Sequence, residues 1–253
     1  MKNDKEKEIN KNQLEGRNAV LELLRSGRDI EKIIIQKGNA EGTIRRILAM
    51  AKEQGVVVQE VVKQKLDDMS QTKNHQGIIA LVPEHDYAEV SDILKIAEEK
   101  GEKPFIVILD NITDPHNLGA VIRTAECAGA HGVIIPKRRS VGLTAVVGKT
   151  SAGAIEYMPV ARVTNISKTI DDLKKAGIWV ACADMGGDDY FDASLDGAIA
   201  IVIGSEGDGV SRLVKEKCDF VVSMPMYGKI SSLNASVAAG LLMYEVVRQR
   251  HYK

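Results

Sequence analysis

Short apolar runs alternate with amphipathic stretches along most of this 253-residue chain. In the C-terminal part, continuous apolar runs predict strands at residues 105–109, 132–135, 178–183, 198–203 and 220–224. Apolar residues at helical spacing predict helices between and after them, at residues 118–128, 169–176, 212–217 and 234–249. Continuous apolar strands separated by helices indicate an α/β fold in which both faces of a parallel sheet are covered.

The N-terminal part repeats this alternation on a smaller scale. It contains predicted strands at residues 30–36, 56–62 and 77–82 and predicted helices at residues 18–25, 43–54 and 63–69. We therefore expect a small α/β domain over residues 13–83, which is long enough to fold around its own core. Residues 1–12 are charged and polar and are expected to be a disordered tail, residues 84–103 a linker with one helix, and residues 104–253 the larger domain.

Composition argues against several classes of protein. No apolar run is long enough to cross a bilayer, and the charged first residues do not resemble a secretory signal, so we expect a cytoplasmic protein without a membrane partner. The three cysteines form no CxxC pair and the histidines show no metal spacing, so neither a disulfide framework nor a metal is expected. Cys127 falls in an apolar helical pattern and is expected to be a buried, inert thiol.

The net charge of −1 gives no global sign of nucleic-acid binding, but a basic patch on one face would suffice for it. Lys137, Arg138 and Arg139 form the densest basic cluster and follow a predicted strand. Such a run usually marks a solvated face. Aromatic residues make up only 4% of the chain, which argues against base stacking as the main binding device.

Ligands of open α/β sheets bind beyond the carboxyl ends of the strands, which directs attention to the loops after residues 109, 203 and 222. The first loop crowds polar side chains before a helix: Asn117 is a good N-cap for that helix, and Arg123 follows inside it. The alternative for this pair is a simple cap and a surface arginine.

The second loop, residues 204–209, has three glycines in six positions, which permits close approach of the backbone to a ligand. Its spacing is not that of a Rossmann fingerprint. A carboxylate at Glu206 would repel phosphates and favours a ligand with a positive centre or hydroxyl and amine donors. An ordinary tight turn with an exposed glutamate is the alternative.

The third loop, residues 224–234, leads into a stretch of small residues, and Ser232 and Asn234 could simply cap the last helix. A fourth glycine-containing stretch, residues 148–150, resembles the end of a P-loop. The first glycine of that motif would fall at Leu143, so we exclude a nucleotide-binding P-loop there.

Together, the three loops resemble the three sequence motifs of the SpoU/TrmH family, a branch of the SPOUT RNA methyltransferases. The residues that carry the resemblance are Asn111, Asp114, Asn117, Gly119 and Arg123 in the first motif, Gly204, Glu206, Gly207 and Gly209 in the second, and Pro225, Met226, Ser232, Leu233 and Asn234 in the third. Residues 15–20 and 75–78 are similar to the N-terminal RNA-binding module of one subgroup. The resemblance to that subgroup implies methylation of a guanosine ribose 2′-hydroxyl in the peptidyl-transferase region of 23S ribosomal RNA.

The resemblance further implies a trefoil knot in the C-terminal domain, a bound S-adenosylmethionine, and a homodimer with active sites near the subunit interface. The cofactor would be held around Gly204, Met224 and Leu233, with Met226 and Ile230 nearby. Positioning residues implied by the motifs are Asn117, Glu206, Ser232 and Asn234.

By the same resemblance, Arg123 activates the 2′-hydroxyl. A guanidinium is normally only a donor, so Arg123 either becomes a transient base or stabilises the developing alkoxide while phosphate or solvent takes the proton. Beside such a site, the cluster at residues 137–139 becomes a candidate phosphate contact, and Arg17 of the small domain is a second one.

Four alternatives stay open from the sequence. The substrate could be transfer RNA, or an adenosine in another region of ribosomal RNA as in resistance-type relatives. The chain could also be an RNA-binding protein without catalysis, although the motif residues Asn117, Arg123, Glu206 and Asn234 are all present. A nucleotide-binding enzyme of Rossmann type is the last alternative, and the fingerprint after its first strand is missing.

Overall fold

The computed structural model describes residues 13–28, 30–38, 42–82 and 86–252, so the expected tail at residues 1–12 lies outside the described part. The described chain forms two compact units. Of the described residues, the first unit takes those up to Asp86 together with Leu143–Glu156, and the second takes Tyr87–Gly142 and those from Tyr157 to Tyr252. The chain therefore leaves the second unit once and returns to it.

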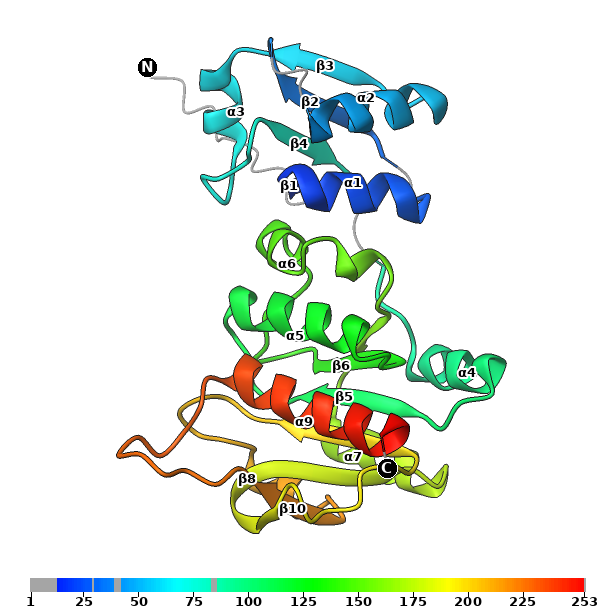
Figure 1. Cartoon of the computed structure of the whole chain (residues 1–253), viewed down its shortest axis with the longest axis vertical. Coiled ribbons are helices and arrows are strands. Elements are labelled where there is room, and N and C mark those ends of the chain that lie inside the picture. Colours follow the sequence, from blue (N-terminus) through cyan, green and yellow to red (C-terminus); the bar gives the residue numbers. More distant parts are fainter. Residues whose placement is uncertain (1–12, 29, 39–41, 83–85, 253) are drawn as a thin grey trace, which may run out of the picture. The chain divides into compact units, whose positions relative to one another are not determined.

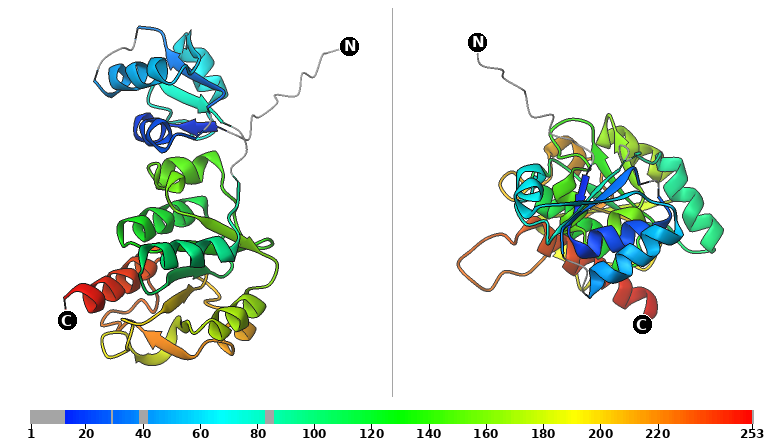
Figure 2. Two further views of the ribbon diagram at one scale, coloured as in Figure 1. Left: turned by 90° about the vertical axis from the view of Figure 1, so that its right-hand side faces the viewer. Right: turned by 90° about the horizontal axis from the view of Figure 1, so that it is seen from above.

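The first unit is built on a four-stranded sheet of order β1-β4-β2-β3. Its strands are β1 (Gln13–Glu15), β2 (Lys32–Gln36), β3 (Val58–Val61) and β4 (Ile78–Leu81). Its helices are α1 (Arg17–Ser26), α2 (Thr43–Glu53), α3 (Lys63–Met69), α6 (Ala145–Thr150) and the 3₁₀ helix η1 (Ala154–Glu156). Helices α1 and α2 pack side by side against one face of the sheet, and Leu66 of α3 packs against the other (Figures 1 and 2).

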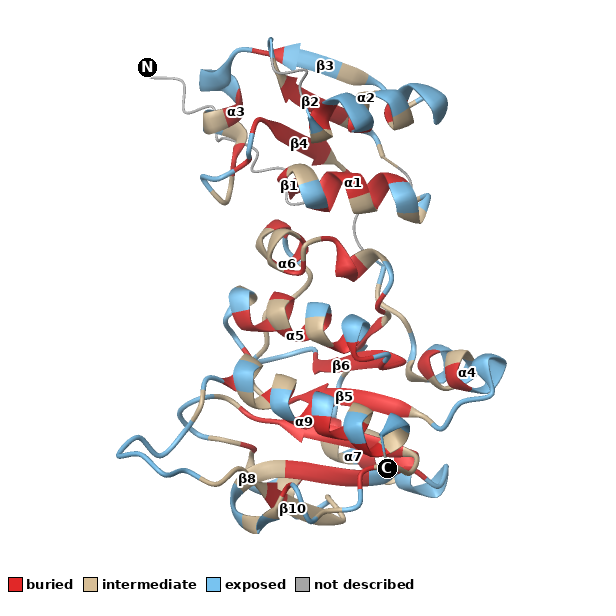
Figure 3. Ribbon diagram, in the orientation of Figure 1, coloured by how far each residue is buried: buried red, intermediate tan, exposed pale blue. Residues whose placement is uncertain are grey.

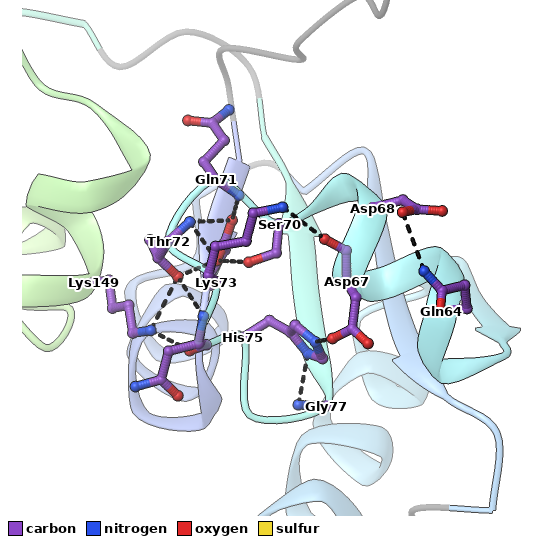
Figure 4. Close-up of polar contacts among 12 residues, drawn as sticks. Gln64, Asp67, Asp68, Ser70, Gln71, Thr72, Lys73, His75, Gly77 and Lys149 are labelled. Carbon is purple, nitrogen blue, oxygen red and sulfur yellow. Dashed lines mark hydrogen bonds and ion pairs between the residues drawn. The ribbon is translucent and has the colours of Figure 1, made fainter.

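A buried carboxylate fixes the loop between α3 and β4. Glu15 accepts hydrogen bonds from the Ser70 hydroxyl (2.7 Å), the Gln71 backbone N–H (2.6 Å) and the Gln13 side chain (2.7 Å), and it also accepts one from Thr72. Burial acts to raise the pKa of Glu15, but these hydrogen bonds outweigh it and leave the pKa below its ordinary value. Figure 4 shows the loop side chains that this network orders.

Lys149 of α6 belongs to the same loop network. Its ammonium donates to the Thr72 hydroxyl (3.0 Å) and to the backbone carbonyl of Asn74 (Figure 4). Gly148 lies against Leu14, because a Cβ there would stand 3.2 Å from the Leu14 Cγ. The stretch at residues 148–150 is thus a packing element of the first unit, in agreement with its exclusion as a P-loop.

The second unit contains a six-stranded parallel sheet of order β10-β8-β9-β5-β6-β7. Its strands are β5 (Phe105–Leu109), β6 (Gly132–Pro136), β7 (Val160–Val163), β8 (Trp179–Asp189), β9 (Ile199–Ile203) and β10 (Phe220–Ser223). The predicted α/β fold with a parallel sheet is confirmed. The trefoil knot stays a prediction.

Helices cover both faces of this sheet. They are α4 (Val90–Lys100), α5 (Pro115–Cys127), α7 (Ile166–Lys175), α8 (Arg212–Lys215) and α9 (Ala235–His251). Helices α4, α7 and α8 contribute Ile93, Ile170 and Val214 to the core on one face, while α5 and α9 pack against each other on the opposite face (Figure 1). Figure 3 shows β5 and β6 buried along their whole length, as expected for central strands between two helix layers.

One residue differs from its predicted environment. Cys127 ends α5 and is exposed, because the apolar face of that helix ends with Ala125 and Ala128 instead. Partial desolvation and the nearby Glu126 carboxylate raise the pKa of the Cys127 thiol. The thiol therefore stays protonated and unreactive at neutral pH, although it is not buried.

The described part of the chain contains neither a candidate membrane-spanning helix nor a candidate metal site. Among residues 13–28, 30–38, 42–82 and 86–252, no helix combines the length and apolar character needed to cross a membrane. Within the same ranges, no three His, Cys, Asp or Glu side chains gather as metal ligands would.

Candidate active site

A cavity of about 550 Å³ opens at the carboxyl ends of β8, β9 and β10 in the second unit. This volume is in the ordinary range for a small-molecule or cofactor site. Of the five predicted cofactor contacts, the cavity is lined by Gly204, Met224, Met226 and Leu233. Ile230 is not a lining residue and is 76% exposed, so the structure does not bring it to the cavity.

The glycine-rich loop after β9 folds back on itself to form one wall of the cavity. Ser205 and Gly209 exchange two backbone hydrogen bonds, of 3.1 and 3.0 Å. A Cβ at Gly204 would stand 2.1 Å from the carbonyl carbon of Gly209, a distance that no side chain can occupy. Gly209 has a φ of 66°, in the left-handed region that favours glycine. The loop thus requires glycine at both of its ends.

Three polar side chains from distant parts of the sequence meet at this loop, and we call Asn117, Glu206 and Asn234 the amide–carboxylate cluster. The Asn117 amide donates to Oε1 of Glu206 at 2.9 Å, and the Asn234 amide donates both to Oδ1 of Asn117 at 3.0 Å and to Glu206. Glu206 also accepts a 3.4 Å hydrogen bond from the backbone N–H of Ala235. The cluster therefore ties the glycine-rich loop to the first turns of α5 and α9.

The structure corrects the predicted cap of α5. The N-cap is Asp114, whose carboxylate accepts a 2.9 Å hydrogen bond from the backbone of His116, and Asn117 lies one turn inside the helix. Pro115 at the first helical position, where its missing N–H costs nothing, explains why the helix starts earlier than predicted. This placement frees the Asn117 side chain for Glu206.

Asn234 serves two purposes at once. Its Oδ1 caps α9 by accepting from the backbone N–H groups of Ser236 (3.0 Å) and Val237 (3.3 Å), while its Nδ2 belongs to the amide–carboxylate cluster. The cap considered as the alternative for Asn234 is thus present together with the cluster. Ser232 is exposed and lines the cavity.

Arg123 lies two turns further along α5 and is exposed. It is not a lining residue of the cavity. Its guanidinium forms no hydrogen bond and no ion pair with any residue in the described part of the chain. The side chain is therefore available to a partner outside this chain.

Sequence reasoning missed two carboxylates at the carboxyl ends of the strands. Asp184, at the cavity wall, forms a 2.7 Å ion pair with Lys215 of α8, and this hydrogen bond raises the pKa of the lysine. Asp110, after β5, is buried and accepts a 2.8 Å hydrogen bond from the backbone of Ser211. Asp110 follows β5, whereas Asp184 lies within β8, but each directly follows an apolar run of the sequence, which is the signal that could have found them.

The predicted basic residues fall into two groups. Lys137, Arg138 and Arg139 are exposed in the loop after β6, and a 3.0 Å backbone hydrogen bond from Val141 to Ile112 holds this loop against the one that leads into α5. Arg17 belongs to the first unit, where its guanidinium donates to the backbone carbonyl of Gln76 at 3.1 Å.

A model of the SpoU rRNA Methylase family matches residues 104–244, which is more than half of the chain and contains the whole cavity. The chain belongs to this family. A second family model, described as RNA 2′-O ribose methyltransferase substrate binding, matches residues 13–88. The resemblance inferred from the three motifs is thereby confirmed, and the Rossmann-type alternative is excluded.

Named relatives agree with this membership. YacO of Bacillus subtilis (strain 168) has a name that assigns it provisionally to the TrmH family of tRNA/rRNA methyltransferases. It is 52% identical to this chain over 238 residues, which cover 93% of this chain and 95% of YacO. The crystal structure of the SpoU methyltransferase AviRb from Streptomyces viridochromogenes, in complex with the cofactor S-adenosylmethionine, has a TM-score of 0.79 and 25% identity, covering 98% and 94% of the two chains. A crystal structure of an RNA 2′-O ribose methyltransferase has a TM-score of 0.78 and 27% identity, covering 94% and 88%.

Proposed function

We propose that this SpoU family chain transfers a methyl group from S-adenosylmethionine to a guanosine ribose 2′-hydroxyl in 23S ribosomal RNA, in the cytoplasm. The observation that carries the proposal is the cavity closed by the glycine-rich loop with the amide–carboxylate cluster at its edge. The cofactor in the AviRb structure and the substrate-binding model over residues 13–88 support it.

The cavity suits S-adenosylmethionine in size and in chemistry. Its apolar lining, including Met224 and Leu233, can cover the adenosine, and the backbone around Gly204 offers donors and acceptors at close approach. Carboxylates of Asp184, Glu206 and Asp208 line it as well, which suits a ligand that carries positive charge. The bound cofactor supplies an electrophilic methyl group whose leaving group is already in place, so no metal is required.

Arg123 is the proposed catalytic residue. A ribose 2′-hydroxyl is a poor nucleophile, and a guanidinium is a donor that stabilises the oxyanion as its proton leaves to a phosphate or to solvent. The exposed guanidinium, without a partner among the described residues, is consistent with a partner supplied by the RNA. Asn117, Glu206 and Asn234 position the elements around it, and Ser232 contacts the bound molecules.

The basic loop residues Lys137, Arg138 and Arg139 are the proposed contacts to RNA phosphates in the second unit, and Arg17 is the proposed contact in the first. The loop residues are supported by their exposure and by a position against the segment that leads into α5, and Arg17 by its partial exposure. Neutralising phosphates supplies most sequence-independent affinity for nucleic acids.

A homodimer is part of the proposal. Val237, Leu241 and Tyr244 recur at helical spacing on α9 and are 51%, 42% and 51% exposed, so they form an apolar stripe opposite the buried face of the helix. Ala238, one residue from this stripe, lines the cavity. A second copy packed on α9 would therefore stand next to the cofactor.

The test is transfer of radiolabelled methyl from S-adenosylmethionine to unmodified 23S ribosomal RNA and, separately, to unmodified transfer RNA, followed by nucleoside analysis. We expect 2′-O-methylguanosine in the ribosomal RNA alone. Label in transfer RNA alone would keep the reaction and overturn the substrate. No label in either RNA, from protein that binds the cofactor, would favour an RNA-binding protein without catalysis.

A further inference from the structure

An arginine that the family motifs do not include lies beside the basic loop. Arg162 is exposed on β7, where it pairs with Ile135 of β6, the strand that leads into the loop. Its guanidinium donates a 3.1 Å hydrogen bond to the backbone carbonyl of Lys137. The same guanidinium lies over the ring of Tyr87, with its carbon 5.1 Å from the ring centroid.

Tyr87 contacts the other end of the loop. Its hydroxyl oxygen lies 2.8 Å from the position that a Cβ at Gly142 would take. The next residue, Ala88, donates a 2.9 Å hydrogen bond to the Val160 carbonyl and bridges to Ala161, which anchors Tyr87 along the edge of β7. Tyr87 and Arg162 thus brace the loop from Lys137 to Gly142 at both ends.

The loop between these braces has a defined shape. Arg139 has a φ of 59°, a conformation that non-glycine residues rarely adopt without support from their surroundings. Backbone hydrogen bonds from Lys137 to Val163 (2.8 Å) and from Val141 to Ile112 (3.0 Å) tie the loop to β7 and to the segment before α5. Its basic side chains remain exposed.

The charges of this region are uncompensated. Lys137, Arg138, Arg139 and Arg162 are all exposed, and none forms an ion pair with a residue in the part of the chain that the structure describes. A surface with four cations and no local carboxylate partner favours an anionic ligand with repeated charges. A nucleic-acid backbone is such a ligand.

We propose that Arg162, stacked on Tyr87, is a positioning residue for RNA binding that holds the basic loop in the shape its phosphate contacts require. This inference rests on the proposed function of the loop. The planar guanidinium can stack on a ring and donate in its own plane at the same time, which a lysine ammonium cannot do. Fixing the loop before binding removes part of the entropy that RNA binding would otherwise cost.

The experiment compares Arg162→Lys, Arg162→Ala, Tyr87→Leu and the double variant Arg162→Lys/Tyr87→Leu. The ligand is an unmodified transcript of the peptidyl-transferase region of 23S ribosomal RNA, titrated over a series of NaCl concentrations. Affinity for S-adenosylmethionine and the thermal unfolding midpoint are measured on each variant. Lys95→Ala, in an exposed i,i+4 pair on α4, is the matched control for loss of a surface cation.

We expect Arg162→Lys and Tyr87→Leu each to raise the Kd for RNA by about fivefold, with the salt dependence of wild type because no positive charge is lost. The double variant should be no weaker than the single ones, because both changes remove the same brace. Cofactor affinity and the unfolding midpoint should stay at wild-type values, and Lys95→Ala should bind RNA normally.

Wild-type affinity in Arg162→Lys, with weaker binding and a shallower salt dependence only in Arg162→Ala, would overturn the inference, since Arg162 would then act only as a charge. A parallel loss of cofactor affinity would overturn it too, by showing a general structural role. The triple alanine variant of residues 137–139 distinguishes failure of the bracing role of Arg162 from failure of the proposed RNA contact by the loop. If that variant binds RNA like wild type, the proposed loop function itself fails.

Discussion

One oxygen atom of Glu206 receives three donors from two separate segments of the chain, namely the Asn117 amide from one and the Asn234 amide and Ala235 backbone from the other. The Asn234 amide also reaches Oδ1 of Asn117, so the orientation of both amides is determined by their partners. Glu206 thus joins the glycine-rich loop to α5 and α9. We therefore expect its main role to be holding these elements in place, and its negative charge to matter less.

Replacement of Glu206 tests this view. Glu206→Ala removes the acceptor that the Asn117 and Asn234 amides share and is expected to lower kcat/KM for methyl transfer roughly 10- to 100-fold, the equivalent of about 1.5–3 kcal/mol. Glu206→Gln keeps one acceptor oxygen and should lose less. Steady-state kinetics on both variants measure the difference, and equal losses would mean that the negative charge, not the acceptor geometry, is what the site needs.

Arg123→Ala is the second prediction at this scale. Methyl transfer should fall to background, while the Kd for S-adenosylmethionine changes by no more than about twofold, because the guanidinium acts on the RNA hydroxyl and does not line the cavity. Isothermal titration and the radiolabel assay check the two quantities. A comparable loss of methyl transfer and of affinity for S-adenosylmethionine would mean that Arg123 supports the structure of the site instead of the reaction.

At the scale of elements, the glycine-rich loop is the most demanding piece of backbone in the second unit. Gly204→Ala would place a methyl group against the carbonyl carbon of Gly209, so the loop must open for the variant to fold. We expect cofactor binding to be lost and the unfolding midpoint to fall. Gly197→Ala is the matched control, because nothing lies within 4 Å of its Cβ position and Gly197 does not line the cavity. The measurement is thermal unfolding with and without S-adenosylmethionine, and a cofactor-induced shift that survives in Gly204→Ala would contradict the prediction.

A buried histidine at the opposite end of the sheet predicts pH-dependent stability. His131 accepts a hydrogen bond from the backbone of Phe105 (3.0 Å) and pairs with Glu102 (3.0 Å), and burial lowers its pKa from the ordinary 6.5 despite that carboxylate. The unfolded chain therefore binds more protons than the folded one. The contribution of His131 to the free energy of unfolding is fully present above the pKa that the histidine has in the unfolded chain, and it is lost as the pH falls towards the lower pKa of the folded state.

We expect the urea midpoint to fall as pH is lowered from about 7 to 5.5, and the fall to be smaller in His131→Gln. Urea unfolding of both proteins across this range measures it. The contribution of Glu15, whose pKa is lowered from 4.5, would be lost only at more acidic pH and does not overlap. Identical slopes in wild type and His131→Gln would contradict the assignment.

Much of the second unit could be predicted because strong periodicity coincides with its elements. The apolar runs became β5, β6, β9 and β10 with small shifts at their ends. The rule that ligands bind at carboxyl ends named three loops, of which those after β9 and β10 line the cavity and the one after β5 does not. The short strand β7 was missed, because four residues with an exposed arginine carry little pattern. The contacts of Arg162 with Lys137 and Tyr87 could not be read from the sequence, since they join segments that only the sheet brings together.

At the scale of the whole molecule, the apolar stripe on α9 determines the proposed assembly. Leu241→Glu places a charge in the middle of the stripe and should convert the dimer to monomers, because burying an unpaired carboxylate costs several kcal/mol, roughly enough to dissociate an ordinary interface. Size-exclusion chromatography with light scattering measures the mass, and Leu213→Glu, at a leucine on α8 that is also exposed but lies outside the stripe, is the control. A wild-type chain that is already monomeric would remove the dimer from the proposal.

The position of β5 has a consequence for the chain while it is being synthesised. This strand, Phe-Ile-Val-Ile-Leu, pairs on one side with β6, which follows closely, but on its other side with β9, where Phe105 meets Ile199. Until the ribosome has delivered residues 199–203, a wholly apolar strand keeps one edge of unpaired backbone open to other chains. Pairing with β6 closes only one of the two edges, so the nascent protein keeps an aggregation-prone edge throughout the synthesis of β7 and β8, and shielding by chaperones would matter until β9 is complete.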